Sequence, residues 1–359
     1  MTPSKIPVAV LGATGTVGQR FVSLLEDHPR FEIAALAASD RSAGRPFGEA
    51  CAWRLPRPLP ATLAAMTVRR VEPDLPAEFV FSALDAETAR DCETRFAAAG
   101  HAVFSNASAF RMEADVPLVV PEVNPDHLAL IEVQRRRRGW SGLLVTNPNC
   151  SAVQLAIALA PLDRAFGVVR VLVTTLQSLS GAGYPGVASL DALANVIPDI
   201  PGEAEKIERE TRRLLGRLEV GGDSVRPAGC AISARTFRVP VETGHTHSVS
   251  VELARAASAD DLIAAWREFR GSPVVASLPT APPRPIEYVD EPHAPQPRRH
   301  AERGSGMVTW IGGLSPCDVL QWKFTVIANN TVRGAAGASV LNAELALETA
   351  VLSAGRRAS

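Results

Sequence analysis

Short apolar runs alternate with amphipathic stretches through the first part of the chain. Residues 6–11 and 31–38 form apolar runs, and between them lies a glycine-rich turn followed by apolar residues at helical spacing over 19–27. This order predicts a βαβ unit. Further elements are expected as buried strands at 79–83, 102–105, 117–120 and 142–145, and as a helix at 87–99. Alternating strands and helices indicate a mainly parallel sheet with helices on both faces.

The pattern changes after residue 150. A long β-branched run covers 168–178, and a proline-rich stretch over 279–296 predicts a loop with a short extended piece at 287–289. Further strands are expected at 228–237, 248–254 and 324–327, and helices at 190–196, 203–215, 259–270 and 334–352. With 359 residues the chain is longer than one compact core usually holds, so two domains are expected.

Composition narrows the class of protein. Hydrophobic residues make up 46% of the chain, charged residues 21%, and the formal net charge is -1. These values are ordinary for a soluble globular enzyme and argue against bulk binding to nucleic acid or to a membrane surface. No apolar run reaches the roughly 18 residues of a membrane span, and residues 1–7 lack the apolar core of a secretory leader. The five cysteines are scattered without a C-x-x-C pair, which fits a reducing cytoplasm and predicts neither disulfides nor a metal site.

The glycine-rich turn after the first strand is a candidate dinucleotide site. Gly12, Gly15 and Gly18 are spaced so that the backbone can approach a pyrophosphate while the following helix offers its N–H groups. Within a βαβ unit this pattern is more specific than a glycine trio alone. The alternative is a tight turn that binds no ligand.

The end of the second strand usually selects between NAD and NADP. An acidic side chain there bonds the ribose 2′-hydroxyl, whereas an arginine pairs with a 2′-phosphate. Asp40 and Arg41 therefore favour different cofactors, and the neighbouring Ser39, Ser42 and Arg45 shift the preference modestly towards NADP.

Cys150 is the candidate nucleophile. It follows an apolar strand and an Asn-Pro-Asn turn, and it precedes an apolar helix over 152–160. A cysteine at a helix N-terminus feels the positive end of the helix dipole, so its pKa is expected to lie below the usual value of about 8.5. The alternative is a buried cysteine that only packs. Beside a nicotinamide site, such a thiolate indicates addition to an aldehyde, hydride transfer and a remaining thioester.

This chemistry needs a base and groups that hold the charges of the substrate. His245 follows Gly244 just before an alternating strand and is the candidate base, with His247 as its competitor. Arg238 offers a planar fork of donors that suits a carboxylate.

Three further polar residues are informative only in combination. Arg111 follows a strand end in the first part of the chain, and open parallel sheets bind their ligands at that edge. Together with Lys206 it can hold a phosphate, although Lys206 alone is typical of a solvated helix face. Gln177 ends the strand at 168–178, and it either bonds a substrate carboxylate or is a buried polar residue.

Several segments of the chain, in this order, resemble the aspartate-semialdehyde dehydrogenase family, especially its archaeal and fungal branch. The most specific motifs are Asn147-Pro148-Asn149-Cys150 and Gly244-His245-Thr246. The other similar segments are 12–18, 41–44, 105–107, 119–124, 180–186, 205–206, 238–241 and 330–337, so the resemblance covers nearly the whole chain. The family makes L-aspartate 4-semialdehyde by NADPH-dependent reduction of aspartyl phosphate.

The resemblance implies a role for each candidate residue. Cys150 is the implied thioester nucleophile and His245 the implied acid/base. The implied substrate contacts are Arg238 and Gln177 for the amino-acid end, Arg111, Asn106 and Lys206 for the phosphate, and Glu203 or Glu205 for the amine. The implied NADP contacts are Gly12, Thr14, Gly15, Thr16, Val17, Gly18, Ser39, Arg41, Ser42, Ser180, Gly181 and Asn330.

The resemblance also implies the fold class. We expect an α/β protein with a Rossmann-type doubly wound sheet domain and an α+β catalytic and dimerisation domain with a mixed sheet. Residues 1–149 and 332–359 are expected to form the NADP-binding domain, and residues 150–331 the second domain. Members of this branch are homo-oligomers, so a homodimer or homotetramer is expected.

Two positions depart from the family pattern and leave open a paralogue with a different substrate. Gly313 stands where the family has an arginine, and Asn329 where it has a histidine. The close alternative is a malonyl-CoA or acyl-CoA reductase, which uses the same cysteine chemistry. N-acetyl-glutamyl-phosphate reductase is more distant, because its Gly-Cys-Tyr-Pro motif is absent here. A non-catalytic dinucleotide-binding sensor would have lost the nucleophile or the base, and both are present.

Overall fold

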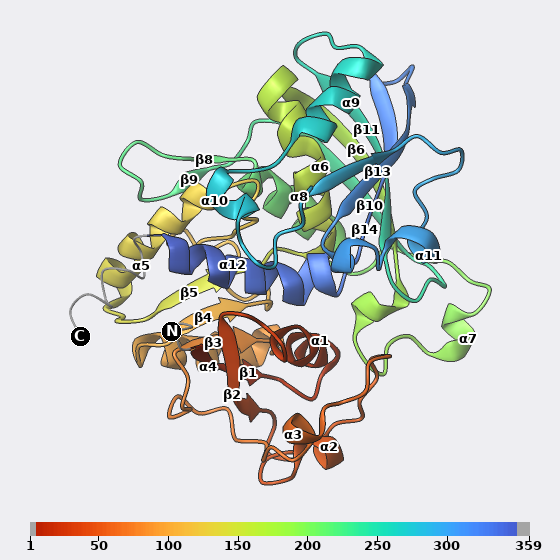
Figure 1. Cartoon of the computed structure of the whole chain (residues 1–359). Helices are drawn as coiled ribbons and strands as arrows, with labels where there is room; N and C mark the ends of the chain where they lie inside the picture. The colour runs from red at the N-terminus through yellow and green to blue at the C-terminus, as the bar shows by residue number, and fades with distance from the viewer. Residues whose placement is uncertain (1–4, 350–359) are drawn as a thin grey trace.

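A parallel sheet organises the first part of the computed structural model, which describes residues 5–349 (Figure 1). Its five strands run in the order β2-β1-β3-β4-β5, and all neighbouring pairs are parallel. The strands are β1 (Ile6–Leu11), β2 (Phe31–Ala37), β3 (Phe79–Ser82), β4 (Ala102–Ser105) and β5 (Leu143–Thr146). Because helices cover both faces, the strands are largely apolar rather than alternating.

The helices around this sheet come from distant parts of the chain. They are α1 (Thr16–Leu25), α4 (Ala86–Ala98), α5 (Leu130–Arg138) and α12 (Gly337–Glu348). α12 packs against β3, β4 and α1, and its Val340 and Leu341 share one hydrophobic core with Phe79 and Phe81. The end of the described chain therefore returns to the sheet with which the chain begins.

A mixed sheet organises the second part. Its seven strands run in the order β12-β13-β14-β11-β6-β10-β7. The pairs β6–β10 and β12–β13 are parallel, and the other neighbours are antiparallel. The strands are β6 (Val168–Gln177), β7 (Ile197–Pro198), β10 (Ala231–Arg238), β11 (His245–Leu253), β12 (Ile286–Val289), β13 (Thr309–Pro316) and β14 (Trp322–Ala328). The expected α/β class, with one parallel and one mixed sheet, is confirmed.

Three helices contact strands of the mixed sheet and lie on one side of it (Figure 1). They are α6 (Cys150–Phe166), α8 (Glu203–Leu214) and α9 (Ala259–Glu268). The remaining short elements are α2 (Phe47–Ala50), α3 (Ala61–Ala64), η1 (Pro125–Ala129), η2 (Leu179–Ala182), α7 (Ser189–Ala192), β8 (Arg217–Leu218), β9 (Val225–Arg226), α10 (Pro273–Ala276), α11 (Pro297–His300), η3 (Gly304–Gly306) and η4 (Val332–Ala336). Of the helices within residues 5–349, none combines the length and the apolar character needed to cross a bilayer.

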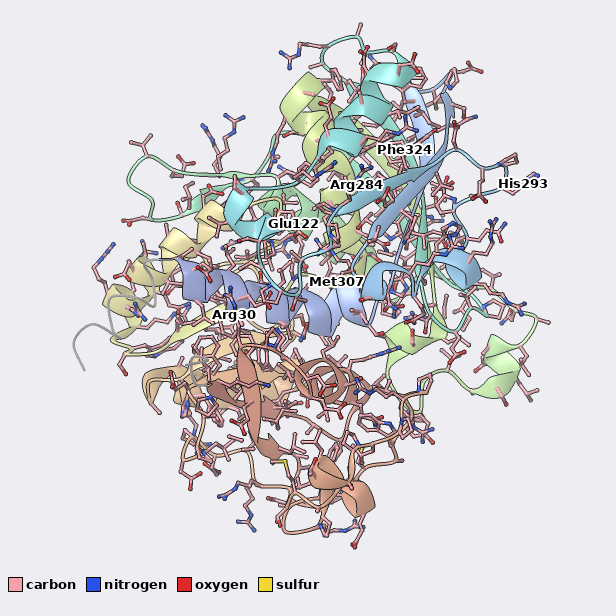
Figure 2. The ribbon with its side chains drawn as sticks, in the orientation of Figure 1. Arg30, Glu122, Arg284, His293, Met307 and Phe324 are labelled. Carbon is pink, nitrogen blue, oxygen red and sulfur yellow. The ribbon has the colours of Figure 1, made fainter. Side chains whose placement is uncertain are left out.

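A buried ion pair lies where the two sheets approach each other. Arg333 donates from Nη2 to Oε2 of Glu122 over 2.7 Å, and both side chains are almost fully buried. Figure 2 shows Glu122 and Met307 close to α12, between the two layers. A Cβ on Gly337, the first residue of α12, would lie 2.5 Å from the sulfur of Met307, so this helix start needs glycine. The last described helix is therefore held by packing and by charge.

Four expectations about secondary structure are wrong or incomplete. Residues 117–120 are not a strand, because only Leu118 forms an isolated bridge, to Thr146. The helix expected at 190–196 is the single turn α7, and β13 was not expected. The final helix starts at Gly337 after a π-helical turn, and the expected end at Leu352 lies outside the described residues, as do residues 1–4 and 350–359.

One carboxyl group is buried inside the first sheet layer. Glu93 of α4 is fully buried, and its Oε1 accepts a hydrogen bond from Ser105 Oγ over 2.6 Å. Burial raises the pKa of this carboxyl from 4.5 to about 7, and the opposing effects of Ser105, Ser82 and Arg111 are smaller. The folded state therefore binds a proton between these two pH values that the unfolded state releases.

Stability should consequently fall as pH rises from about 4.5 to about 7. Glu93→Gln keeps an acceptor for Ser105 without a charge, so it should gain up to roughly 3 kcal/mol over the wild type above this window and little below it. Urea unfolding at about pH 4 and about pH 8 measures the difference. Glu87→Gln, exposed on the same helix, is the control, and an equal effect at both pH values for Glu93→Gln would contradict the prediction.

Candidate active site

Cys150 is the first residue of α6, directly after the turn that leaves β5. Asn149 caps the helix, because its Oδ1 accepts the N–H groups of Ser151 (2.9 Å) and Ala152 (3.3 Å). The predicted strand, turn and helix around the cysteine are therefore confirmed. The capping also explains why an asparagine precedes the cysteine.

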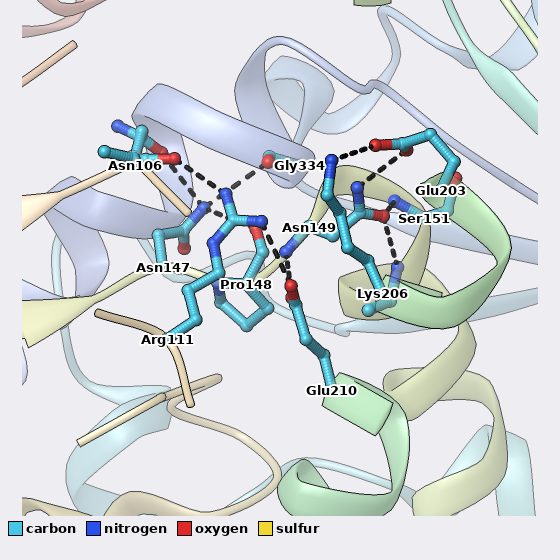
Figure 3. Close-up of polar contacts among 12 residues, drawn as sticks. Asn106, Arg111, Asn147, Pro148, Asn149, Ser151, Glu203, Lys206, Glu210 and Gly334 are labelled. Carbon is cyan, nitrogen blue, oxygen red and sulfur yellow. Dashed lines mark hydrogen bonds and ion pairs between the residues drawn. The ribbon is translucent and has the colours of Figure 1, made fainter. Parts of the chain in front are cut away.

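Two carboxylates of α8 hold the turn in place (Figure 3). Glu210 Oε2 accepts the backbone N–H of Asn149 over 2.6 Å, and Glu203 Oε2 accepts the Asn149 amide over 2.8 Å. Glu210 is buried and was not expected to take part in the site. A signal was present in the sequence, since Glu203, Lys206 and Glu210 follow the i, i+3, i+7 spacing of one helix face.

His245 contacts the cysteine. It is the first residue of β11, and its Nε2 lies 3.2 Å from Cys150 Sγ. The competing His247 is engaged elsewhere, because the amide of Gln154 donates to its Nε2 over 2.8 Å. The structure therefore brings the two predicted catalytic residues together, although 95 positions separate them in the chain.

The expectation of a low cysteine pKa is wrong. Burial raises the pKa of Cys150 to about 12, and the negative charge of Glu203 adds to the rise. Arg111 and Arg238 act in the opposite direction but do not prevail. The thiol form therefore dominates at neutral pH, and the sulfur needs a base to ionise it.

Burial also affects the imidazoles. It holds the pKa of His245 well below its ordinary value, and the neighbouring His247 and Arg238 lower that pKa further. Burial lowers the pKa of His247 to about 3. Both rings are consequently neutral near pH 7.

One continuous pocket joins the cysteine to the glycine-rich turn. Its lining includes the expected residues Thr16, Val17, Asn106, Arg111, Cys150, Ser180, Gly181, Glu203, Lys206 and Asn330. Glu205 is not among them: it is exposed on α8, which leaves Glu203 as the carboxylate of this pair inside the pocket. No group of side chains suited to a metal ion occurs within residues 5–349.

The basic residues of the pocket are held by acceptors (Figure 3). Arg111 donates to the carbonyl of Asn106 over 2.7 Å and to Glu210 over 3.2 Å. Lys206 Nζ lies 3.0 Å from Glu203 Oε1. Two donors, Asn106 Nδ2 and Arg111 Nε, are buried without any hydrogen-bond partner in the described part of the chain. An anion is the kind of ligand that such donors bind.

Arg238 and Gln177 lie opposite each other at the ends of the paired strands β10 and β6. Arg238 donates to the carbonyl of Ser178 over 2.8 Å, and Gln177 is buried next to it. Gly181 packs onto this group, because a Cβ there would lie 2.8 Å from Arg238 Nη1 and 2.9 Å from His245 Cε1. The site therefore requires a glycine at position 181.

The glycine-rich turn is closed tightly on itself. A Cβ on Gly18 would lie 2.1 Å from the carbonyl oxygen of Gly12, and Gly12 has a φ of +70°. Gly15 donates its N–H to the same Gly12 oxygen over 3.0 Å, and Gln19 holds the carbonyl of Thr14 over 3.1 Å. The turn thereby places the N-terminus of α1 at the pocket, where it can receive a phosphate.

The residues at the end of β2 lie apart from the pocket lining. Ser39 and Arg41 are exposed and Ser42 is half-buried. Asp40 is engaged by Arg70, with 3.4 Å between Oδ1 and Nε. Arg41 has no ionic partner within residues 5–349, so it is free to receive an anionic group.

Two family models match the chain. The semialdehyde dehydrogenase NAD binding domain matches residues 7–131, and the semialdehyde dehydrogenase dimerisation domain matches residues 159–333. The aspartate-semialdehyde dehydrogenase of Methanothermobacter thermautotrophicus is 48% identical over 95% of this chain and 98% of its own length. The chain belongs to the semialdehyde dehydrogenase family.

Other members of the semialdehyde dehydrogenase family are also similar. The aspartate-semialdehyde dehydrogenase of Cryptococcus neoformans is 44% identical over 97% of this chain and 98% of its own length. The crystal structure of aspartate-semialdehyde dehydrogenase with NADP from Candida albicans superposes with a TM-score of 0.89 at 39% identity, covering 96% of this chain and 99% of that one.

The two departures from the family pattern have local explanations. Gly313 lies in a bulge of β13 with a φ of +63°, a conformation that favours glycine over arginine. Asn329 Oδ1 accepts from Thr331 N (2.9 Å), Thr331 Oγ1 (3.0 Å) and Val332 N (2.9 Å), and so caps the turn that leads into η4. Neither residue lines the pocket.

Gly181→Ala should lower kcat/KM by about 100-fold, because the added methyl group displaces both Arg238 and His245 from their positions. Steady-state kinetics of NADP reduction with the aldehyde substrate measure this loss of kcat/KM. Gly229→Ala is the matched control, since nothing lies within 4 Å of a Cβ at that position. Equal kinetics for the two variants would show that the close packing of Gly181 does not matter.

Proposed function

We propose that this protein catalyses the reversible, NADPH-dependent conversion of L-aspartyl 4-phosphate into L-aspartate 4-semialdehyde through a thioester on Cys150. The 3.2 Å contact between Cys150 Sγ and His245 Nε2 carries the proposal, since Cys150 lines the same pocket as Thr16 and Val17 of the glycine-rich turn. A nucleophile and a base beside a dinucleotide turn are the set that thioester chemistry needs. The shared name of the relatives supports the substrate, and with it a role in the biosynthesis of lysine, methionine and threonine.

NADP fits the residues at the glycine end of the pocket. The turn has no room for a side chain at Gly18, and it directs the N-terminus of α1 towards the space where a pyrophosphate would bind. Arg41, with Ser39 and Ser42, would hold the 2′-phosphate, because Asp40 is paired with Arg70. Ser180, Gly181 and Asn330 would contact the cofactor from the other side of the pocket. When bound, NADPH supplies the hydride that reduces the thioester carbon.

Cys150 and His245 make the remaining bond and proton changes. In the reductive direction the sulfur attacks the acyl carbon, the bond from that carbon to the phosphate oxygen breaks, and phosphate leaves with the electron pair of that bond and takes up a proton from water. His245 takes the thiol proton as the carbon–sulfur bond forms, and it returns this proton to the sulfur when that bond breaks again. The raised pKa of Cys150 makes this proton transfer necessary.

Polar residues of the pocket, and Arg238 and Gln177 next to it, match the charges of the substrate. The unpartnered donors of Asn106 and Arg111, together with Lys206, would hold the phosphate. At the opposite side, Arg238 and Gln177 would hold the α-carboxylate, and the carboxylate of Glu203 would meet the amine. Positive groups therefore lie at both ends of the expected substrate, with one negative group between them.

An acyl-CoA reductase with the same cysteine chemistry is the second candidate. It has less use for a carboxylate that binds an amine, whereas Glu203 lies inside the pocket. A dinucleotide-binding sensor is disfavoured because it has no need for a contact between a cysteine and a histidine. The amine-binding carboxylate therefore favours the aspartyl substrate.

The purified protein should reduce NADP when given aspartate semialdehyde and phosphate, and Cys150→Ala should lose this activity while it still binds NADP. Absorbance at the nicotinamide band follows the reaction, and cofactor fluorescence follows binding. The same assay with coenzyme A and malonate semialdehyde, and with NAD in place of NADP, tests the alternatives. Faster turnover with coenzyme A than with phosphate would reject the aspartyl assignment.

We further propose that residues 1–149 and 332–359 form the NADP-binding domain and that residues 150–331 form the catalytic and dimerisation domain. The separate sheets support this division, and so does the packing of α12 on the first one. All five cysteines are free, which supports a reducing, cytoplasmic setting.

We propose a homodimer through the face of the mixed sheet that lies opposite α6 and α8. β6 exposes Leu172 and Leu176 on this face, with 47% and 38% of their surfaces accessible. Small hydroxyl side chains continue the face along the adjacent β11, with Ser248 exposed and Thr246 half-buried. A flat face of apolar and small polar residues suits a two-fold contact with a second copy, and a tetramer would pair two such dimers.

Leu172→Glu should convert the dimer into a monomer, because it places a charge in the centre of the proposed contact. Light scattering after size-exclusion chromatography measures the mass. Val220→Glu is the control, since Val220 is fully exposed in the turn between β8 and β9. A wild-type monomer, or a Leu172→Glu dimer, would place any interface elsewhere.

A further inference from the structure

The Nδ1 atom of His245 faces two groups of one residue. The backbone N–H of Ser178 lies 3.1 Å away and its Oγ lies 3.0 Å away. The backbone N–H can only donate, so it favours the neutral ring with the proton on Nε2. In that form Nε2–H donates to the sulfur of Cys150 and cannot accept the thiol proton. The ring acts as a base only in the other neutral tautomer, which has its hydrogen on Nδ1 and a free lone pair on Nε2.

The hydroxyl of Ser178 has an acceptor on the side away from the ring. Its Oγ donates to Asn330 Oδ1 over 3.0 Å. The backbone N–H of Gly244 donates to the same oxygen over 2.9 Å, and the amide nitrogen of Asn330 donates to Ser180 Oγ over 2.9 Å. These two contacts fix which end of the Asn330 amide is oxygen. The hydroxyl hydrogen of Ser178 can therefore point to Asn330 while an oxygen lone pair faces His245.

We propose that Ser178, oriented by Asn330, is the positioning residue that allows His245 to take the proton of Cys150. The S–H bond breaks, its electron pair stays on sulfur, and the proton bonds to Nε2. The ring that accepts this proton is the neutral tautomer with its single hydrogen on Nδ1, so the product is the positively charged imidazolium. Throughout the step the Nδ1 hydrogen donates to Ser178 Oγ, and the Ser178 hydrogen donates to Asn330 Oδ1. The inference rests on the proposed function, because it specifies how the base of that reaction works.

Within the described residues, no other side chain can accept a hydrogen bond from Nδ1–H of His245. Arg238 of β10 and His247 of β11 both disfavour a positive ring, and Cys150 of α6 lies at the opposite nitrogen. Gly181 packs against the ring edge without a side chain. Within residues 5–349 no carboxylate hydrogen-bonds to His245, so the hydroxyl of Ser178 is the acceptor that remains for Nδ1–H.

Alkylation of Cys150 by iodoacetamide tests the role of Ser178 and needs neither cofactor nor substrate. The rate is measured against pH, with the Cys150 peptide followed by mass spectrometry because four other cysteines are present. Ser178→Ala should slow alkylation at neutral pH about tenfold and displace the profile by about one unit to higher pH. It should also lower kcat/KM about 100-fold. Ser178→Thr retains the hydroxyl and should restore both, and Asn330→Ala should displace the profile in the same direction.

A double-mutant cycle separates this role from a merely structural one. In a His245→Ala background, Ser178→Ala should have no further effect on the alkylation profile, because it acts only through the ring. An equal effect in both backgrounds, or a Ser178→Ala profile that coincides with the wild type, would overturn the inference. The result does not depend on the acyl substrate: failure of the aspartate semialdehyde assay with an intact Ser178 effect would reject the proposed substrate alone.

Discussion

The catalytic pocket depends on the attachment of one turn, residues 147–149, to the helix α8. Glu210 holds the backbone of Asn149 and Glu203 holds its side chain, so the start of α6 is fixed relative to the second sheet. Because Glu210 also pairs with Arg111, the same carboxylate joins the nucleophile turn to a loop of the first sheet. Hydrogen bonds to buried charges are stronger than neutral ones, and removing one partner leaves an uncompensated charge. The relative placement of nucleophile and anion site is therefore a property of α8.

The carboxylates of α8 also neutralise the basic residues next to Cys150. Each basic residue beside the cysteine, except Arg238, has a carboxylate partner, which limits how far the cations can stabilise a thiolate. Within the described residues 5–349, Arg238 donates only to the carbonyl of Ser178, so it stays available to a ligand. The position of Cys150 at the first turn of α6 does not overcome burial, and its pKa rises. The site therefore depends on proton transfer within the pocket rather than on a permanently ionised sulfur.

Local sequence patterns were sufficient for some parts of this picture and not for others. The strand, turn and helix around Cys150 could be predicted because turn residues and apolar runs act over a few positions. Residues 117–120 form one isolated bridge, from Leu118 to Thr146, and not the expected strand. An apolar run shows burial but not whether backbone pairing continues along a strand. β13 was missed because Gly312 and Gly313 interrupt its pattern.

Local sequence patterns were also insufficient for some residues of the active site. His245 was one of two candidate bases from its local context, and the family resemblance selected it over His247. Spacing could not show its contact with Cys150, because Cys150 begins helix α6 whereas His245 begins strand β11. Glu210 was missed although it shares a face with Glu203 and Lys206. Ser178 was missed because its part depends on the meeting of β6, β11 and the segment at Asn330. Direction and burial of polar groups are tertiary properties, and the pKa of Cys150 was mispredicted for that reason.

The return of α12 to the first sheet has a consequence for synthesis on the ribosome. Val340, Leu341 and Leu345 belong to the same core as β1 and β3, yet they are translated more than two hundred residues later. The amino-terminal half must therefore leave the exit tunnel with part of its apolar surface uncovered, and it stays so until translation is nearly finished. A nascent chain of this design has reason to recruit a chaperone during elongation, and a stop codon anywhere before α12 would release a product with an incomplete amino-terminal core.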